Sequence, residues 1–300
     1  MSPIQLYNMA EEPPVSKLKL AIVGHEKNGK SWLASTGRRN VLVHDFDNRA
    51  ESLQGKPGVY VISYTDPQWP MQPDAAALYL DVLGRLEESL DLADLVKAIP
   101  QLAKNLKQIP KETFIRTNVI DSVQTFGKAY MNYALFGSPT IRRELTIGKM
   151  KVFLPGGWDA WNAEMVPVEQ AILRFLALPT DTIVTLHETA EETPDSTSEK
   201  PRYTGRIGVF PVRYQRLIKY FNEVWRVKLT QTVLNNKSAY SPKVYPCPTY
   251  EFDCATAMLL DQVEEPNIEA IIAKHESRVN HKGLLPQSEA KKQLPAGVKL

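Results

Sequence analysis

Gly24-His25-Glu26-Lys27-Asn28-Gly29-Lys30-Ser31 is the stretch that decides the fold, and it lies between an apolar run at 18–23 and a helical pattern at 30–36. It fits the glycine-rich pattern of a phosphate-binding loop, or P-loop. In such a loop backbone N–H groups point at phosphate, the lysine reaches the β- and γ-phosphate oxygens, and the hydroxyl binds Mg²⁺. We therefore expect Gly24 to Ser31, together with Trp32, to hold a nucleoside triphosphate and Mg²⁺.

Short apolar runs alternate with helical patterns along the chain around this loop. Further strands are expected at 41–44, 59–63, 114–120 and 182–186, and helices at 30–36, 75–90, 92–106, 122–134 and 166–177. Such alternation indicates an α/β fold with a mostly parallel central sheet flanked by helices. The β-rich segments at 224–230, 232–234 and 243–245 are expected to extend one edge of the sheet as antiparallel strands.

The ends of the chain and its composition narrow the class of protein. We expect an N-terminal arm at 1–16, a core at 17–260 with a helical insert at 66–110, and a helix with a mobile tail at 261–300. No apolar run approaches the roughly 20 residues that cross a bilayer, and the N-terminus does not resemble a secretory signal. The 36 basic residues nearly balance 34 acidic ones, and the two cysteines match no zinc site or disulfide framework. These features predict a cytoplasmic protein without a membrane segment.

Polar side chains follow three of the expected strands, at the edge where the phosphate loop lies. Asp121 is the candidate to organise Mg²⁺ through water, and the alternative role is to cap the next helix. Asp45 and Asp47 would share one face of an extended segment, with Asp47 as the catalytic carboxylate and Asp45 in support, or else both cap a turn. His187 is either a sensor of the γ-phosphate or a structural histidine.

The order of these motifs resembles the RecA-like ATPase core, and more narrowly the phage RecA-like ATPases of the Sak single-strand annealing group, which belong to the phage AAA-type nucleotide-binding proteins. The resemblance spans roughly 17–260. Besides the P-loop it rests on Val-Ile-Asp-Ser-Val-Gln at 119–124, Ile-Val-Thr-Leu-His-Glu at 183–188 and Tyr-Phe-Asn-Glu-Val-Trp-Arg-Val at 220–227. It implies a RecA-like P-loop NTPase core that uses ATP and Mg²⁺.

The resemblance also implies roles for single residues. Asp47 stands where the RecA family usually has a catalytic glutamate, so the carboxylate is one methylene shorter and hydrolysis is expected to be slow or DNA-stimulated. His187 stands at the polar sensor position. The family assembles into rings or filaments in which a neighbouring subunit donates a basic residue. The candidates for that residue are Arg213, Arg216 and Arg226.

Two segments interleave basic and aromatic residues, as single-stranded DNA binding requires. The first segment is 137–158, with the candidates Arg142, Arg143, Lys149 and Lys151. The second is 190–211, with the candidates Arg202, Tyr203 and Arg206. Their positions after the fourth and fifth strands resemble the two DNA-facing loops of RecA-like proteins, although two solvated loops would give the same pattern.

The function expected from these features is an ATPase that acts on single-stranded DNA in phage recombination or replication, by annealing or strand exchange, in the host cytoplasm. Its expected partners are single-stranded DNA, further copies of itself and a single-strand binding protein. The alternatives are a nucleotide-gated assembly protein with weak hydrolysis, a DNA-translocating motor and a small-molecule phosphotransferase.

Overall fold

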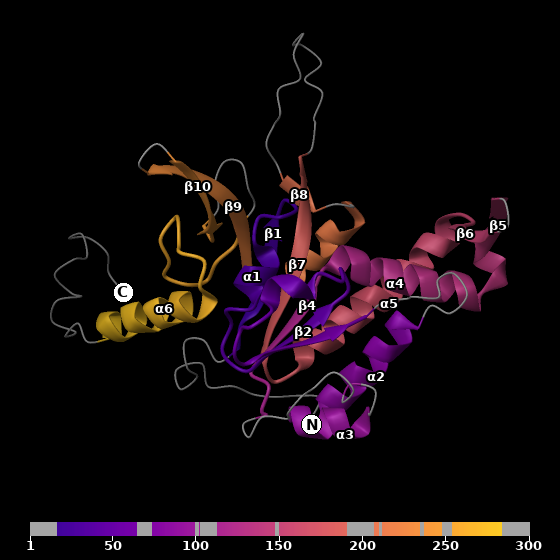
Figure 1. Cartoon of the computed structure of the whole chain (residues 1–300), viewed down its shortest axis with the longest axis horizontal. Helices are drawn as coiled ribbons and strands as arrows, with labels where there is room; N and C mark the ends of the chain where they lie inside the picture. The colour runs from indigo at the N-terminus through magenta and orange to yellow at the C-terminus, as the bar shows by residue number, and fades with distance from the viewer. Residues whose placement is uncertain are drawn as a thin grey trace, which may run out of the picture.

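The computed structural model describes residues 17–64, 74–99, 102, 113–147, 150–190, 207–209, 212–234, 237–247 and 254–283. Within these ranges, one sheet of eight strands forms the centre of the protein (Figure 1). Seven strands lie in the order β10-β9-β1-β7-β4-β2-β3, and β8 pairs with β7 outside this order. The strands are β1 (Lys19–Gly24), β2 (Val41–Asp45), β3 (Val59–Ser63), β4 (Thr117–Asp121), β7 (Asp181–Ala190), β8 (Ile207–Val209), β9 (Glu223–Leu234) and β10 (Lys237–Tyr245).

Most strand pairs of this sheet are parallel. The pairs β1–β7, β1–β9, β2–β3, β2–β4 and β4–β7 run parallel, whereas β9–β10 and β7–β8 run antiparallel. The predicted α/β fold with a mostly parallel sheet is therefore confirmed. The extension of one edge is also confirmed, with the detail that β9 lies parallel to β1 and only β10 reverses direction.

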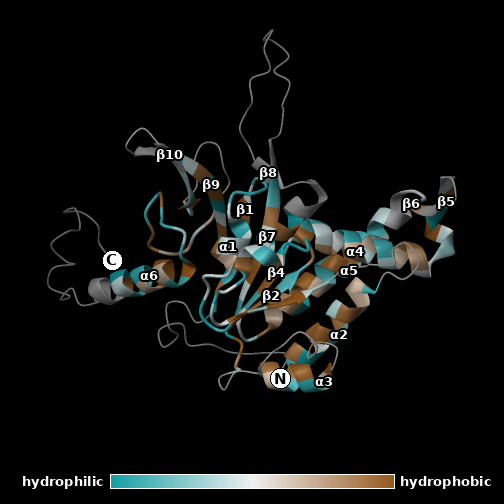
Figure 2. Ribbon diagram, viewed as in Figure 1, coloured by the Kyte–Doolittle hydropathy of each residue, from teal (hydrophilic) through white to brown (hydrophobic). Residues whose placement is uncertain are grey.

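Helices cover both faces of the sheet, which explains why its strands are apolar on both sides. On β1, Ala21 and Val23 belong to one core cluster, and Leu20 and Ile22 to the other. The first cluster packs under α2 (Ala75–Glu88), α3 (Leu92–Ala98), α4 (Val123–Gly137) and α5 (Trp158–Ala177), and the second under α1 (Lys30–Ala34) and α6 (Ile268–Gly283). Figure 2 shows hydrophobic residues along the central strands and on the helices that cover them.

Several predicted elements differ from the structure in their bounds or type; the strand expected at 114–120, for example, is β4 (Thr117–Asp121). The helix expected to begin at Val166 begins at Trp158, so that Pro167 lies inside the helix and not in its first turn, where proline is common. The segment 137–158, expected to be a DNA-facing loop, contains an antiparallel hairpin of β5 (Arg142–Ile147) and β6 (Met150–Pro155). The helix expected over 92–106 ends as α3 at Ala98.

The described part of the expected insert at 66–110 packs on the core. Tyr79, Leu83 and Leu86 of α2 are buried in the same cluster as the strands. The expected arm at 1–16 and the tail from 284 lie outside the described residues. None of the helices in the described part of the chain has the length and apolarity that a bilayer crossing requires.

Candidate nucleotide-binding site

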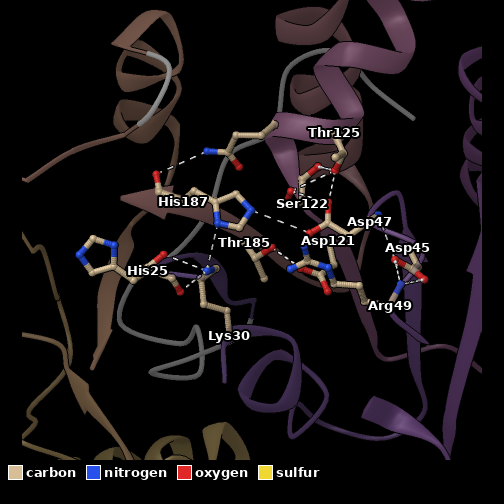
Figure 3. Close-up of polar contacts among 12 residues, drawn as sticks. His25, Lys30, Asp45, Asp47, Arg49, Asp121, Ser122, Thr125, Thr185 and His187 are labelled. Atoms are coloured by element: carbon tan, nitrogen blue, oxygen red, sulfur yellow. Dashed lines mark hydrogen bonds and ion pairs between the residues drawn. The ribbon is translucent and has the colours of Figure 1, made fainter. Parts of the chain in front are cut away.

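The carboxyl ends of the parallel strands β1, β7, β4 and β2 meet at one edge of the sheet. The strand register places Gly24 beside His187, and Asp45 beside Asp121. Strands far apart in sequence thus bring the P-loop and His187 to one place. The three expected aspartates, Asp45, Asp47 and Asp121, lie there too (Figure 3). In open α/β sheets this edge is where ligands bind.

The P-loop follows β1 directly, and its two glycines are required by geometry. Gly29 has φ of 86°, a left-handed conformation that glycine adopts without strain. A Cβ atom on Gly24 would lie 2.6 Å from the carbonyl oxygen of Val227 on β9. The same carbonyl accepts a hydrogen bond of 3.2 Å from the Asn28 side chain. The loop thus lies directly against β9, to which Asn28 ties it.

Lys30 lies folded into the centre of the loop. Its side-chain nitrogen donates to the carbonyl oxygens of Gly24 and His25 at 2.8 and 2.7 Å, and lies 3.3 Å from His187 Nδ1. Burial lowers the pKa of Lys30 to about 8, although the nearby carboxylates of Asp121 and Asp47 oppose the shift. The ammonium is thus placed where phosphate oxygens could replace the two carbonyls.

Asp121 is buried at the end of β4, with the hydroxyls of Ser31 and Thr185 as hydrogen-bond donors. Burial raises the pKa of Asp121, and these two hydrogen bonds oppose the rise. In the described residues no group of three or more His, Cys, Asp or Glu side chains could hold a metal ion. The donor set fits Mg²⁺ nonetheless, because this ion takes one or two protein oxygens together with phosphate and water. Ser31 and Asp121 would supply those oxygens.

Asp47 lies in a bend after β2 and not in an extended segment, so it does not share a strand face with Asp45 as predicted. Its carboxylate accepts hydrogen bonds from Ser122, at 2.9 Å, and from Thr125, both at the start of α4. The other carboxylate oxygen lies 3.9 Å from His187 Nε2. Burial alone would raise the pKa of Asp47, but these contacts together lower it below its usual range.

Asp45 shapes the loop that carries Asp47. Its carboxylate accepts hydrogen bonds from the backbone N–H groups of Asp47, Arg49 and Ala50, at 3.0 to 3.3 Å. The supporting role predicted for Asp45 is thus that of a turn-capping residue, the alternative that its sequence position also allowed.

His187 lies between the phosphate-binding lysine and the carboxylate of Asp47 (Figure 3). One ring nitrogen faces Lys30 and the other faces Asp47. The imidazole ring therefore lies close to both the P-loop lysine and the carboxylate of Asp47. The next residue, Glu188, was not singled out from the sequence. It is buried and contacts His25 at 3.0 Å and Arg226 at 2.6 and 2.8 Å.

The three basic residues considered for donation to a neighbouring subunit differ in their surroundings. Arg226 is buried in its own chain, beside Glu188. Arg216 pairs with Glu169 of α5 at 3.1 Å and is about half exposed. Arg213 lies in the 3-10 segment Val212–Tyr220, and its side chain is outside the described part of the structure.

The residues considered for DNA binding are only partly described. Arg142 and Arg143 lie on β5, where Arg142 pairs with Glu144 at 3.0 Å and lies over the Phe153 ring at 4.1 Å. Lys149, Arg202, Tyr203, Arg206 and the side chain of Lys151 lie outside the described residues. Figure 1 shows that β5, which carries Arg142 and Arg143, lies far from β1 and α1, which flank the P-loop.

Comparison with known families agrees with the geometry of this edge. A profile described as an AAA domain matches residues 16–244, from before β1 into β10. The chain belongs to this AAA domain family. It is thus an AAA-type P-loop protein with a nucleoside triphosphatase core. No curated protein matches the chain.

Proposed function

We propose that this AAA-domain protein binds ATP and Mg²⁺ at residues 24–32 and hydrolyses the ATP. The observation that carries the proposal is the position of His187 between Lys30 and Asp47, at 3.3 and 3.9 Å. Lys30 would neutralise charge on the phosphates, and Asp47 would orient the attacking water. Mg²⁺ would add a further positive charge that the phosphoryl group needs, and Ser31 and Asp121 would position it.

The surroundings of Asp47 support slow hydrolysis. A carboxylate with a lowered pKa accepts a proton poorly, because base strength falls with pKa. Asp47 therefore serves to orient water more than to deprotonate it. A partner that shifts α4 would move Ser122 and Thr125 away from the Asp47 carboxylate. The carboxylate would then be free to act on water, and hydrolysis would be stimulated.

We further propose that the partner is single-stranded DNA and that the protein acts on it as a ring or filament, by annealing or strand exchange in phage recombination or replication. The β5–β6 hairpin supports this part. It extends away from the sheet at the far ends of α4 and α5 (Figure 1). It presents the exposed Arg143 beside the exposed apolar side chains Leu145 and Leu154, which offer a cation for phosphates and an apolar surface for bases.

ATP turnover with and without single-stranded DNA tests this proposal. We expect hydrolysis to rise on addition of DNA, and DNA binding to weaken steeply with salt, because phosphate contacts release counterions. Arg143→Ala should weaken DNA binding without changing DNA-free turnover. Turnover that ignores DNA, together with no salt-sensitive binding, would remove the DNA part. Directional movement along the strand would replace annealing with a motor.

A nucleotide-gated assembly protein is the second candidate function. It is favoured by the hydrogen bonds that the Asp47 carboxylate accepts from Ser122 and Thr125, because they leave this group less free to act on water. If nucleotide binding alone sets the oligomeric state, Asp47→Asn should assemble with ATP as the wild type does, whereas Lys30→Ala should not. Sedimentation of both variants with ATP separates the two functions. If Asp47→Asn assembles but loses activity on DNA, hydrolysis drives the biological step and the second candidate is wrong.

A further inference from the structure

An apolar row on the β9–β10 hairpin continues past the core, next to the P-loop. Val227 and Val244 pair across the hairpin and are fully buried. The next pair on the same face is Leu229 and Pro242, and the following pair includes Tyr240, because side chains of one face recur every second residue. Leu229 and Tyr240 are 42% and 65% exposed. The row thus changes from buried to exposed as it passes the loop.

Contacts fix this row against the P-loop. Pro242 lies next to Gly29, since a Cβ atom added to this glycine would be only 3.4 Å from Pro242 Cβ. Asn28 holds the Val227 carbonyl on β9. Tyr240 is two residues from Pro242, about 7 Å farther along the strand. This is the scale of the step from the phosphates of a nucleotide to its base.

The order of the strands gives the direction in which a bound nucleotide would lie. His187, Asp121 and Asp47 stand on or just after β7, β4 and β2, on one side of β1. β9 and β10 lie on the other side of β1 (Figure 1). A triphosphate that crosses the P-loop with its γ-phosphate facing those three residues would have its other end on the side of the hairpin.

We propose that Tyr240, with Leu229 beside it, forms the wall on which the base of the bound nucleoside triphosphate stacks. The proposal rests on the nucleotide binding proposed above and adds its base subsite. A base presents a flat π-face, and an exposed tyrosine ring offers the matching surface. Leu229 and Pro242 supply the apolar floor between this ring and the phosphates.

Comparison of ATP with inorganic tripolyphosphate, each with Mg²⁺, tests the wall directly, because tripolyphosphate has the phosphates and no base. Binding of both is measured by titration calorimetry on the full chain. Tyr240→Ala should weaken ATP binding roughly tenfold, as expected for the loss of one stacked base, and leave tripolyphosphate binding unchanged. Tyr240→Phe, which keeps the ring, should bind ATP as the wild type does. Tyr133→Ala on α4, with a tyrosine 49% exposed, is the matched control and should change neither ligand.

The possible failures are distinguishable. If the wild type binds both ligands and Tyr240→Ala leaves ATP binding intact, the wall is wrong while the proposed function stands. Equal weakening of both ligands, with dissociation of the oligomer in sedimentation, would make Tyr240 a subunit contact and also overturn the wall. If the wild type binds neither ligand, the proposed function fails and the wall fails with it.

Discussion

Glu188 and Arg226 form a buried ion pair that joins the end of β7 to β9 across the end of β1. Two hydrogen bonds of 2.6 and 2.8 Å connect them, and their side chains are 1% and 7% exposed. Because Glu188 also contacts His25, the pair braces the first residue after Gly24 in the P-loop. The pair therefore links the stability of the sheet to the shape of the loop.

Replacement of Arg226 should be strongly destabilising. Arg226→Ala leaves the Glu188 carboxylate buried without its main cation, and we expect a loss of about 3–5 kcal/mol in the free energy of unfolding. Urea denaturation measures it. Arg216→Ala is the control, since this exposed pair with Glu169 should contribute less than about 1 kcal/mol. Equal effects of the two substitutions would show that burial of the pair has no energetic consequence.

Gly24 should tolerate no side chain. Gly24→Ala places a methyl group 2.6 Å from a backbone oxygen of β9, so β1 and β9 must separate. We expect about 1–3 kcal/mol of destabilisation, as for other overpacked sites, and loss of nucleotide binding. Gly84→Ala in α2 meets no atom within 4 Å and should be neutral or stabilising by up to about 1 kcal/mol. Thermal unfolding and ATP titration of both variants measure these effects. If Gly24→Ala unfolds at the wild-type temperature and binds ATP as the wild type does, the loop tolerates a side chain and the prediction is wrong.

ATP binding should weaken as the pH rises through about 8. The pKa of Lys30 is lowered to about 8 by burial, so the free protein loses this ammonium above that pH. Phosphate binds the charged form, and affinity should fall up to tenfold for each further pH unit until the pKa of the bound state is reached. Lys30→Arg keeps its charge over this range, and its affinity should be flat between pH 7.5 and roughly 9.5. A decline of equal slope in both proteins would assign the effect to another group.

Asp47→Asn should separate turnover from binding. The substitution keeps the size of the side chain and removes the carboxylate that orients the attacking water, so kcat should fall by about 10²-fold while the Kd for ATP changes little. Single-turnover hydrolysis and equilibrium titration give the two quantities. Ser122→Ala removes one of the hydrogen bonds that lower the Asp47 pKa and should preserve, or modestly raise, kcat. A variant Asp47→Asn with unchanged kcat would remove Asp47 from the chemistry.

The candidate site residues that the sequence brings forward are those marked by a local pattern. Gly24, Lys30 and Ser31 sit in one motif, and Asp121 ends a run whose apolar pattern marks a buried strand. The sequence pattern does not reveal the bend at Asp47. The prediction that Asp45 and Asp47 share one face assumes that the strand continues to Asp47, whereas β2 ends at Asp45. Asp45 ends the strand by binding three backbone N–H groups, which a pattern of apolar residues does not reveal.

The parts that depend on strand order could not be predicted. Glu188 and Arg226 are 38 residues apart in sequence, and they meet only because β7 and β9 flank β1. Pro242 reaches Gly29 for the same reason. The hairpin of β5 and β6 is hard to recognise from the sequence, since the charged side chains at 142–144 interrupt the alternation of apolar and polar residues that marks a strand.

The position of β9 beside β1 also has a consequence for biosynthesis. Leu20 pairs with Glu223, and Asn28 bonds to Val227, which lies 199 residues later, so the strand that leads into the P-loop gains one of its two neighbours long after it is synthesised. Contacts this distant in sequence are slow to form, because a long loop must close first. On the ribosome, the P-loop would remain without the carbonyl of Val227 and the ring of Pro242 until that point. The capacity to bind nucleotide should thus appear only once β9 has been synthesised and has paired with β1.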